Sequence, residues 1–280
     1  MPNAYANLTQ LKSAGWLNIT ATTYDSDLLR MLQDAAFWCD DFARRHFYCW
    51  EGTQYFDGAG ITFIPNEDIL NITTISLDLD GSQGYSTTLG ATDYFKYPLS
   101  GPFLWPKTML KMSHTSGIGY FASGIRAGIK IIGVFGYGDG QRQTPYDASG
   151  AVVNTGGITD SATTHTLATG KGALLAVGQT IRIGSEQLYI TGITVDTLTF
   201  MRGQNGTTAA AHTAADIIYI YTYPGPVIEA NLIQATRWWK RRETAFQTAV
   251  QSEAGTYNVY KGLDPDVQLM LAKYIKRALI

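Results

Sequence analysis

Charge and cysteine are both scarce in this chain. Of its 280 residues, 16% are Asp, Glu, Lys or Arg and 45% are hydrophobic, and the formal net charge is −2. Intrinsic disorder requires the opposite balance and is excluded. The large positive field that many nucleic-acid-binding proteins carry is missing as well. Cys39 and Cys49 are the two cysteines, and we expect both to be buried thiols, because nothing in the sequence points to an oxidising compartment.

Long apolar runs are also missing. The best of them, Ile129 to Phe135, is far shorter than the roughly 20 residues that a membrane helix needs, and Gly133 interrupts it. We therefore expect no membrane partner. The opening residues, Met1 to Tyr5, lack the basic and then apolar pattern of a signal peptide, which predicts a protein made in the cytoplasm.

No set of residues with catalytic spacing is present. The sequence has no His-x-x-x-His pair for a metal and no Gly-x-Ser-x-Gly motif for a serine nucleophile. Gly133-x-x-Gly136-x-Gly138 follows an apparent strand, as phosphate-binding loops do, but no Lys-Ser or Lys-Thr pair follows it, so a tight turn is favoured. The sequence therefore predicts a protein that is not an enzyme and that binds no metal or cofactor. The histidines are scattered: His46, His114, His165 and His212.

Helical periodicity marks the first 45 residues. Asn7 is a suitable cap for a short helix to Lys12. Asp25 to Asp27 can cap a longer helix that continues to about Arg45. One apolar face of that helix is defined by spacings of three and four residues: Leu28, Leu32, Ala35, Cys39 and Phe42.

Helical signals return after residue 224. Apolar residues from Ile228 to Val250 fall roughly on one face, and a linker centred on Gly255 follows. Asp264 and Pro265 then form the cap and first position of a last helix. Its apolar face is Val267, Leu271, Tyr274 and Ala278.

Between the helices, the hydrophobic period changes to two. Asp57-Gly58 and Asp80-Gly81 each lie beside alternating runs and predict β-hairpins. Ile129 to Phe135 predicts a further strand. A loop-prone segment with Pro98, Pro102 and Pro106 precedes it and carries Phe103 and Trp105.

The region from about residue 147 to 223 has almost no charge and many Thr and Gly residues, with short strands at close spacing. We predict an α+β fold on this basis. Residues 1–146 and 224–280 would form a helical bundle with β-hairpins or a small sheet. Residues 147–223 would form an inserted all-β barrel or sandwich domain.

Aromatic and basic residues adjoin each other near residue 240. Such a cluster can stack on bases and hold phosphates, or it can place Trp239 in the core and its cations at a subunit contact. Both interpretations stay open. The residues available for a contact with DNA or with another subunit are Trp238, Lys240, Arg241 and Arg242.

A series of short motifs occurs in order along the helical and hairpin regions. The pieces are Leu8-x-x-Leu11-Lys12, Asp27-Leu28-Leu29, Asp34-Ala35-Ala36, Arg45-His46-Phe47, Tyr55-Phe56-Asp57-Gly58, Asp93-Tyr94, Gly133-Val134-Phe135-Gly136-Tyr137, Pro226-x-Ile228-x-Ala230 and Trp239-Lys240-Arg241-Arg242. Their order and spacing over residues 4–140 and 224–280 resemble the head–tail connector, or adaptor, proteins of long-tailed double-stranded-DNA bacteriophages.

This resemblance implies a structural virion protein. Members of the family form a ring, typically of twelve subunits, under the portal protein of the capsid. The ring extends the DNA channel, through which packaged DNA passes without sequence specificity, and it contacts the next neck or tail-completion protein. The implied location is the virion neck, between capsid and tail.

In that family the C-terminal segment commonly reaches the portal. By resemblance, residues 255–280 form a portal-docking segment, and a free amphipathic helix after a linker would suit this task. The residues implied in docking are Lys261, Val267, Leu271, Lys273, Tyr274, Ile275, Lys276, Arg277, Ala278, Leu279 and Ile280.

The β region has a resemblance of its own. Its segments from Val177 to Glu186 and from Arg202 to His212 look like a small β module of various phage structural proteins. Gly203 and Gly206 permit a turn with positive φ around Asn205. An alternative function is therefore a binding module, in which this region recognises a glycan or another virion protein.

Overall fold

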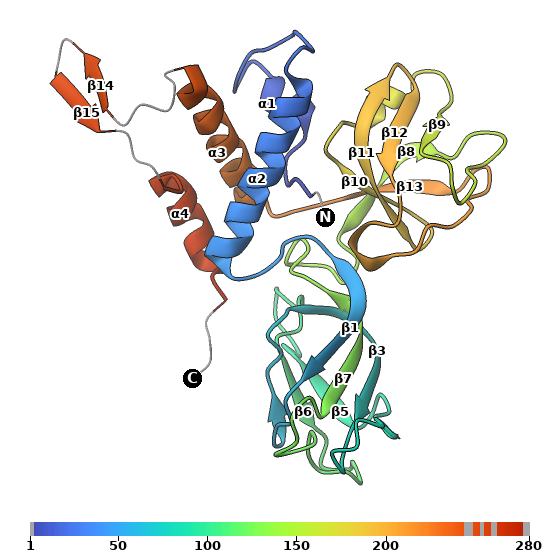
Figure 1. Ribbon diagram of the computed structural model, residues 1–280. Coiled ribbons are helices and arrows are strands. Elements are labelled where there is room, and N and C mark those ends of the chain that lie inside the picture. Colours follow the sequence, from blue (N-terminus) through green and yellow to red (C-terminus); the bar gives the residue numbers. More distant parts are fainter. Residues whose placement is uncertain (1–2, 244–248, 253–254, 259–261, 277–280) are drawn as a thin grey trace. The chain divides into compact units, whose positions relative to one another are not determined.

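The computed structural model describes residues 3–243, 249–252, 255–258 and 262–276 (Figure 1). The chain divides into two compact units. Unit 1 comprises Met1–Arg44, Asp147–Gln204 and Thr208–Ile280, and unit 2 comprises Arg45–Tyr146 and Asn205–Thr207. Whether the predicted segments 1–146 with 224–280, and 147–223, fold independently stays a prediction.

The predicted helical bundle is wrong. The structure is mostly β, with 28% strand and 23% helix, and its larger sheets have four, three and six strands. The physical reason lies in residues 45–146, which the prediction placed in the bundle. They make two sheets around a hydrophobic core of their own, so their apolar residues do not pack on the helices as a bundle requires.

Helix α1, Leu8–Lys12, begins as predicted. The Asn7 side chain accepts a hydrogen bond from the Gln10 amide, and the Gln10 side chain accepts one from the Asn7 amide, both at 2.9 Å. This reciprocal arrangement satisfies two amide groups that a helix start otherwise leaves unpaired. The predicted cap at Asn7 is confirmed.

Helix α2, Asp25–Ala43, has the apolar face that the periodicity predicts, since Leu28, Leu32, Ala35 and Cys39 are buried. The predicted side-chain cap is wrong. Tyr24 is the capping residue and makes no side-chain cap bond, and the aspartates lie in the first turn, where they favour the helix dipole. Arg44 ends the helix with a φ of 52°.

Helix α3, Gly225–Glu243, packs against α2. The expected continuation of this helix to Val250 is wrong, because Ala249–Ser252 is strand β14. It pairs with strand β15, Gly255–Asn258, in an antiparallel ladder that uses backbone groups a helix would need. Gly255 thus begins a strand, and the linker predicted there is also wrong.

Helix α4, Pro265–Leu271, has the predicted cap, since the Asp264 side chain accepts a hydrogen bond from the Asp266 amide at 2.9 Å. A short 3₁₀ turn, Ala272–Tyr274, follows it. α4 packs on α3 and α2, and Val267 and Leu271 are fully buried.

The β module, residues 147–223, contributes a six-stranded sheet to unit 1. Its hydrophobic core includes Ile181, Leu188, Ile190 and Phe200. The sheet has the order β8-β13-β10-β11-β12-β9. Its strands are β8 (Tyr146–Val152), β9 (Thr164–Thr166), β10 (Thr180–Ile183), β11 (Glu186–Thr194), β12 (Thr197–Met201) and β13 (Ile217–Tyr221). Asn205 has a φ of 51°, which confirms the predicted turn between Gly203 and Gly206.

A buried carboxylate organises the loops of the β module. Two nitrogens of the Arg202 guanidinium donate to the Glu186 carboxylate, each at 2.7 Å, and His212 Nε2 lies 2.8 Å from it. Burial alone would raise the pKa of Glu186, but hydrogen bonds from Arg202, from the amides of Gly203 and Ala210, and from His212 lower it to about 2. The charged form is therefore the one that the fold requires.

Unit 2 contains two antiparallel sheets, with the orders β1-β7-β3-β4 and β2-β6-β5. Phenylalanine rings fill its core, among them Phe56, Phe63, Phe121 and Phe135. Its strands are β1 (Trp50–Phe56), β2 (Thr62–Phe63), β3 (Ile69–Leu77), β4 (Thr87–Thr88), β5 (Tyr94–Tyr97), β6 (Met109–Met112) and β7 (Ile129–Phe135). The predicted strand from Ile129 to Phe135 is confirmed.

One of the two predicted hairpins exists. β3 pairs with β4 around Asp80-Gly81, and the Asp78 carboxylate accepts hydrogen bonds from turn amides. The hairpin at Asp57-Gly58 is wrong, because β1 pairs with β7 while β2 pairs with β6. The Gly58 amide donates to the Ile125 carbonyl at 2.7 Å, so the chain there leaves the first sheet and does not turn back along it.

The Glu186 network predicts an acid-sensitive β module. Because the folded-state pKa lies below the usual 4.5, the stabilisation is present above about pH 4.5 and is lost as the pH falls toward 2. Glu186→Gln leaves the Arg202 charge unpaired and should lower the free energy of unfolding by about 3–5 kcal/mol at neutral pH. Urea denaturation measures this effect. The exposed Asp160→Asn should change it by less than about 0.5 kcal/mol, and equal effects would contradict the role of the network.

Candidate assembly interface

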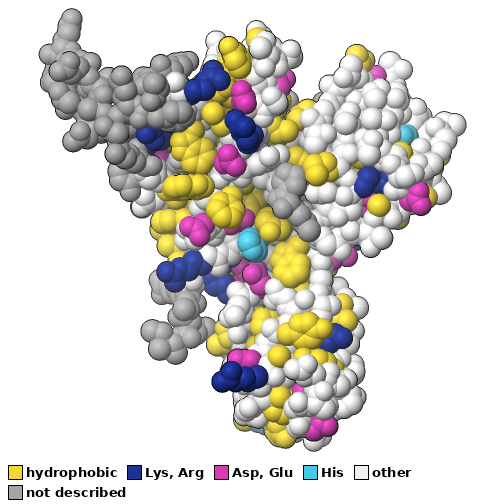
Figure 2. All heavy atoms as spheres, in the orientation of Figure 1, with side chains coloured by type: hydrophobic (Ala, Val, Ile, Leu, Met, Phe, Trp, Pro, Cys, Tyr) yellow, Lys and Arg dark blue, Asp and Glu magenta, His cyan; other side chains and the backbone are white. Residues whose placement is uncertain are grey.

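The outer face of α2 exposes large aromatic side chains. Phe37 is 70% and Trp38 43% exposed, although the opposite face of the same helix is buried. Figure 2, in the orientation of Figure 1, shows hydrophobic side chains over α2 and α3, interspersed with basic and acidic side chains. Contiguous exposed apolar surface on a protein commonly marks a contact with another molecule.

A shallow hollow of about 420 Å³ lies between the outer faces of α2 and α3, and we call it the helical hollow. The Trp38 and Trp238 rings meet edge to face there, with centroids 5.8 Å apart. The residues that line it are Arg30, Met31, Asp34, Phe37, Trp38 and Trp238. Aromatic residues and arginine are enriched at the energetically important positions of protein–protein interfaces.

The predicted aromatic and basic cluster is divided between the core and the surface. Trp239 is buried, and the Arg242 guanidinium lies 3.7 Å from its ring centroid and 4.9 Å from that of Tyr24. Trp238 lines the helical hollow, Lys240 is exposed and Arg241 is half-buried. Packing on aromatic rings thus occupies Arg242, and contact of this cluster with DNA or with another subunit stays a prediction.

Unit 2 has an exposed apolar segment of its own in the loop from β5 to β6. Leu99 is 56% and Phe103 66% exposed. We call residues 98–106 the tip loop, and they include no charged residue. Lys107 braces the loop, because its ammonium group donates to the Pro98 carbonyl at 2.7 Å and lies 4.5 Å from the Trp105 ring centroid.

The residues implied in portal docking differ in their exposure to solvent. Val267, Leu271 and Tyr274 are buried, so the apolar face of α4 is already covered within unit 1. Lys273 is exposed, Ile275 is half-buried and the Lys276 amide donates to the Ala43 carbonyl at 2.9 Å. Leu269, which the sequence analysis did not select, is 78% exposed. Lys261, Arg277, Ala278, Leu279 and Ile280 lie outside the described residues.

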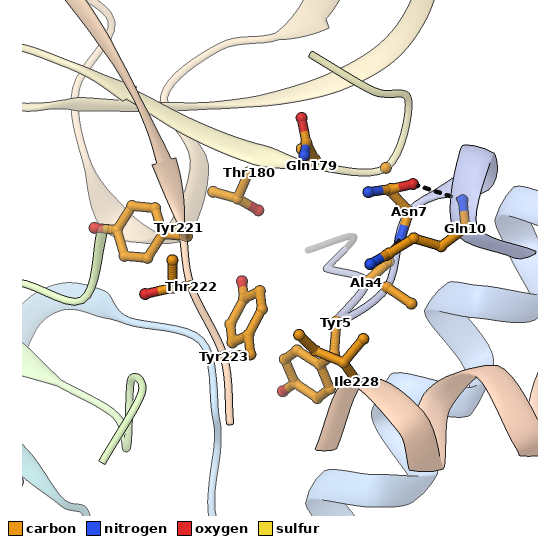
Figure 3. A pocket seen from close by; sticks show the side chains of 12 residues that line it. Ala4, Tyr5, Asn7, Gln10, Gln179, Thr180, Tyr221, Thr222, Tyr223 and Ile228 are labelled. Carbon is orange, nitrogen blue, oxygen red and sulfur yellow. Dashed lines mark hydrogen bonds between the residues drawn. The ribbon is translucent and has the colours of Figure 1, made fainter. Parts of the chain in front are cut away.

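A second hollow, of about 210 Å³, lies within unit 1 beside the N-terminal segment and strands β10 and β13 (Figure 3). Tyr5, Tyr221 and Tyr223 contribute rings to it, and the capping bond from the Gln10 amide to Asn7 is at its edge. The twelve residues that line it include no Asp, Glu, Lys, Arg, His or Cys. It therefore offers no strong acid or base for catalysis.

Among the described residues, burial in the fold shifts the pKa of several titratable groups. Burial, with a smaller contribution from Asp40, raises the pKa of the Cys39 thiol, and burial lowers the pKa of His165. Burial raises the pKa of Tyr189 to about 12 although Gln33 donates to its hydroxyl. Both cysteines are buried and free, as predicted. In the part of the chain that the structure describes, no three His, Cys, Asp or Glu side chains are placed to hold a metal ion.

Membrane insertion by a helix finds no support among the described segments, none of which is both long and apolar enough to span a bilayer. The predicted phosphate-like Gly series forms a tight turn after β7, as favoured, with φ values of 120° at Gly136 and 63° at Gly138. No helix begins at this turn.

Sequence reasoning missed Phe37 and Trp38. At 100° per residue, Phe37 lies about 180° around α2 from Leu28, in the middle of the face that should be polar. An aromatic residue at that position is the signal that could have revealed the surface.

No protein-family model matches the sequence, and no curated protein matches it.

The exposure of Phe37 predicts that its substitution affects association more than folding. Phe37→Ser should change the free energy of unfolding by less than about 0.5 kcal/mol, because the ring is already in water. Leu32→Ala, on the buried face of the same helix, should lower it by about 2–5 kcal/mol. Urea denaturation measures both. A large loss of stability in Phe37→Ser would show that the ring is part of the core.

Proposed function

We propose that this chain is a head–tail connector adaptor, a structural subunit that forms a ring beneath a phage portal and joins the capsid to the tail. The observation that carries the proposal is the exposed aromatic surface of the helical hollow, on a chain with little charge. Protein–protein interfaces are enriched in aromatic residues and arginine, and the lining of this hollow contains Phe37, Trp38, Trp238 and Arg30. The ordered motifs of the helical and hairpin segments support the particular class of assembly.

The proposed ring has twelve subunits, as is typical of the family that the sequence resembles. It would contact the portal on one side and the next neck or tail-completion protein on the other, and DNA would pass through it without sequence specificity. A channel of this kind needs no strongly basic lining, because tight phosphate binding would hinder the movement of DNA. The net charge of −2 is compatible with that requirement.

Docking to the portal is proposed for the outer side of the C-terminal segment. The inner side of α4 already packs on α3, and Arg237 pairs with Asp264 at its start. Leu269 and Lys273 point away from this packing, as their exposure indicates. An exposed leucine next to a cation can contact a partner without unfolding the helical layer.

We expect the chain to be largely monomeric alone and to assemble into rings on its portal, because docking supplies the free energy that weak subunit contacts lack. Sedimentation velocity with and without portal, followed by negative-stain electron microscopy, tests this. Leu269→Ser should weaken portal binding at least tenfold with the fold retained. Asp266→Ser, an exposed change in the same helix, is the control. Failure to bind any portal, or equal oligomerisation in its absence, would contradict the proposal.

A further inference from the structure

This chain exposes two different apolar surfaces. The helical hollow is a concave aromatic site on unit 1, and the tip loop is a segment of unit 2 with Phe103 and Leu104 exposed. A closed ring requires two different surfaces, since each subunit must offer one surface to the next copy and another to the previous copy. A single surface that binds itself would produce a dimer and stop.

The two surfaces carry charged groups that can pair with each other. From Tyr94 to Ser113, the strands and loop that carry the tip loop contain three lysines and no acidic residue. The lining of the helical hollow contains one cation, Arg30, which lies 3.2 Å from Asp27, and one anion, Asp34. A complementary charge pair can guide two surfaces together and fix their orientation.

Within α2, two of the acidic residues already have cationic partners. Asp25 pairs with Lys12, and Asp27 lies 3.2 Å from Arg30. Asp34 is exposed and is the acidic residue of the hollow's lining. Lys96, on strand β5 next to the tip loop, is half-buried and is the corresponding cation.

We propose that the tip loop of one copy docks in the helical hollow of the next copy, with Phe103 against Trp38 and Trp238 and with Lys96 beside Asp34. This proposal adds a contact between subunits to the proposed function. It rests on that function for the closing of such contacts into a ring. Aromatic rings prefer offset and edge-to-face neighbours, which the two tryptophans offer to an inserted phenylalanine. A contact of one loop per subunit is small, which agrees with weak association of the free chain.

Zero-length carbodiimide cross-linking of the full-length chain tests the contact. This reagent joins carboxylates to amines that touch, and a mixture of ¹⁴N- and ¹⁵N-labelled chains separates links between copies from links within one. We expect a Lys96–Asp34 link between copies, reduced at least tenfold in Phe103→Ser and in Trp38→Ala. Tyr120→Ser, another exposed aromatic of unit 2, should leave it unchanged.

Charge exchange provides an independent readout by sedimentation. Asp34→Lys and Lys96→Asp should each weaken association, and the chain with both changes should regain it. A mixture of the Phe103→Ser and Trp38→Ala chains should form pairs, because the intact tip loop of the Trp38→Ala chain can dock in the intact hollow of the Phe103→Ser chain. It should form no rings, because no further intact contact remains in such a pair. Pairs of either variant alone would contradict a contact between two different surfaces.

The outcomes separate this inference from the proposed function. Rings on the portal with no Lys96–Asp34 link, and with Phe103→Ser assembling normally, would overturn the inference and leave the adaptor function standing. The link between copies without any binding to portal would support the contact and overturn the adaptor function. No association under either condition would overturn both.

Discussion

The side-chain amide of Asn231, in α3, joins the N-terminal segment and α2 to α3. It is fully buried, its oxygen accepts a hydrogen bond from the Ala6 amide at 2.9 Å, and its nitrogen donates to the Leu32 carbonyl at 2.8 Å. A buried amide without a hydrogen-bond partner costs about 1–3 kcal/mol. The two hydrogen bonds of Asn231 therefore stabilise the packing of the N-terminal segment and α2 against α3. The helical layer, and therefore the aromatic surface that it displays, depends on this contact between segments that lie far apart in the sequence.

The packing of α2 against α3 explains how a small layer of helices can expose large aromatic side chains and still be stable. α2 and α3 bury one face each against the other, and these faces include Leu28, Leu32 and Ala235. Burial of these residues supports the layer, which leaves Phe37 and Trp38 free to serve contacts with other molecules. One face of α2 is buried and the opposite face exposes aromatic rings, and this division underlies both the proposed adaptor function and the proposed contact between copies.

Local signals in the sequence predicted local structure well. The caps at Asn7 and at Asp264, the buried face of α2 and the strand that ends at Phe135 all follow from short-range hydrogen bonding or periodicity. Some errors were local, such as the side-chain cap expected for α2 and the helix expected to reach Val250, and others concerned long-range pairing. Asp57-Gly58 has the composition of a hairpin turn, but β1 finds its partner in β7, more than seventy residues later, and pairing of that range has no local signature.

The sequence by itself determined where α1, α2 and α4 begin, that the chain has too few charges for disorder, and that the β region carries its own turn chemistry. Periodicity and side-chain hydrogen bonding act over a few residues, which is why these features were readable. Only the tertiary structure decided that residues 45–146 build separate sheets, that the apolar face of α4 is covered, and that Trp38 and Trp238 share one hollow. These outcomes depend on which apolar surfaces, distant in the sequence, are buried against each other. Burial of this kind is a property of the folded chain.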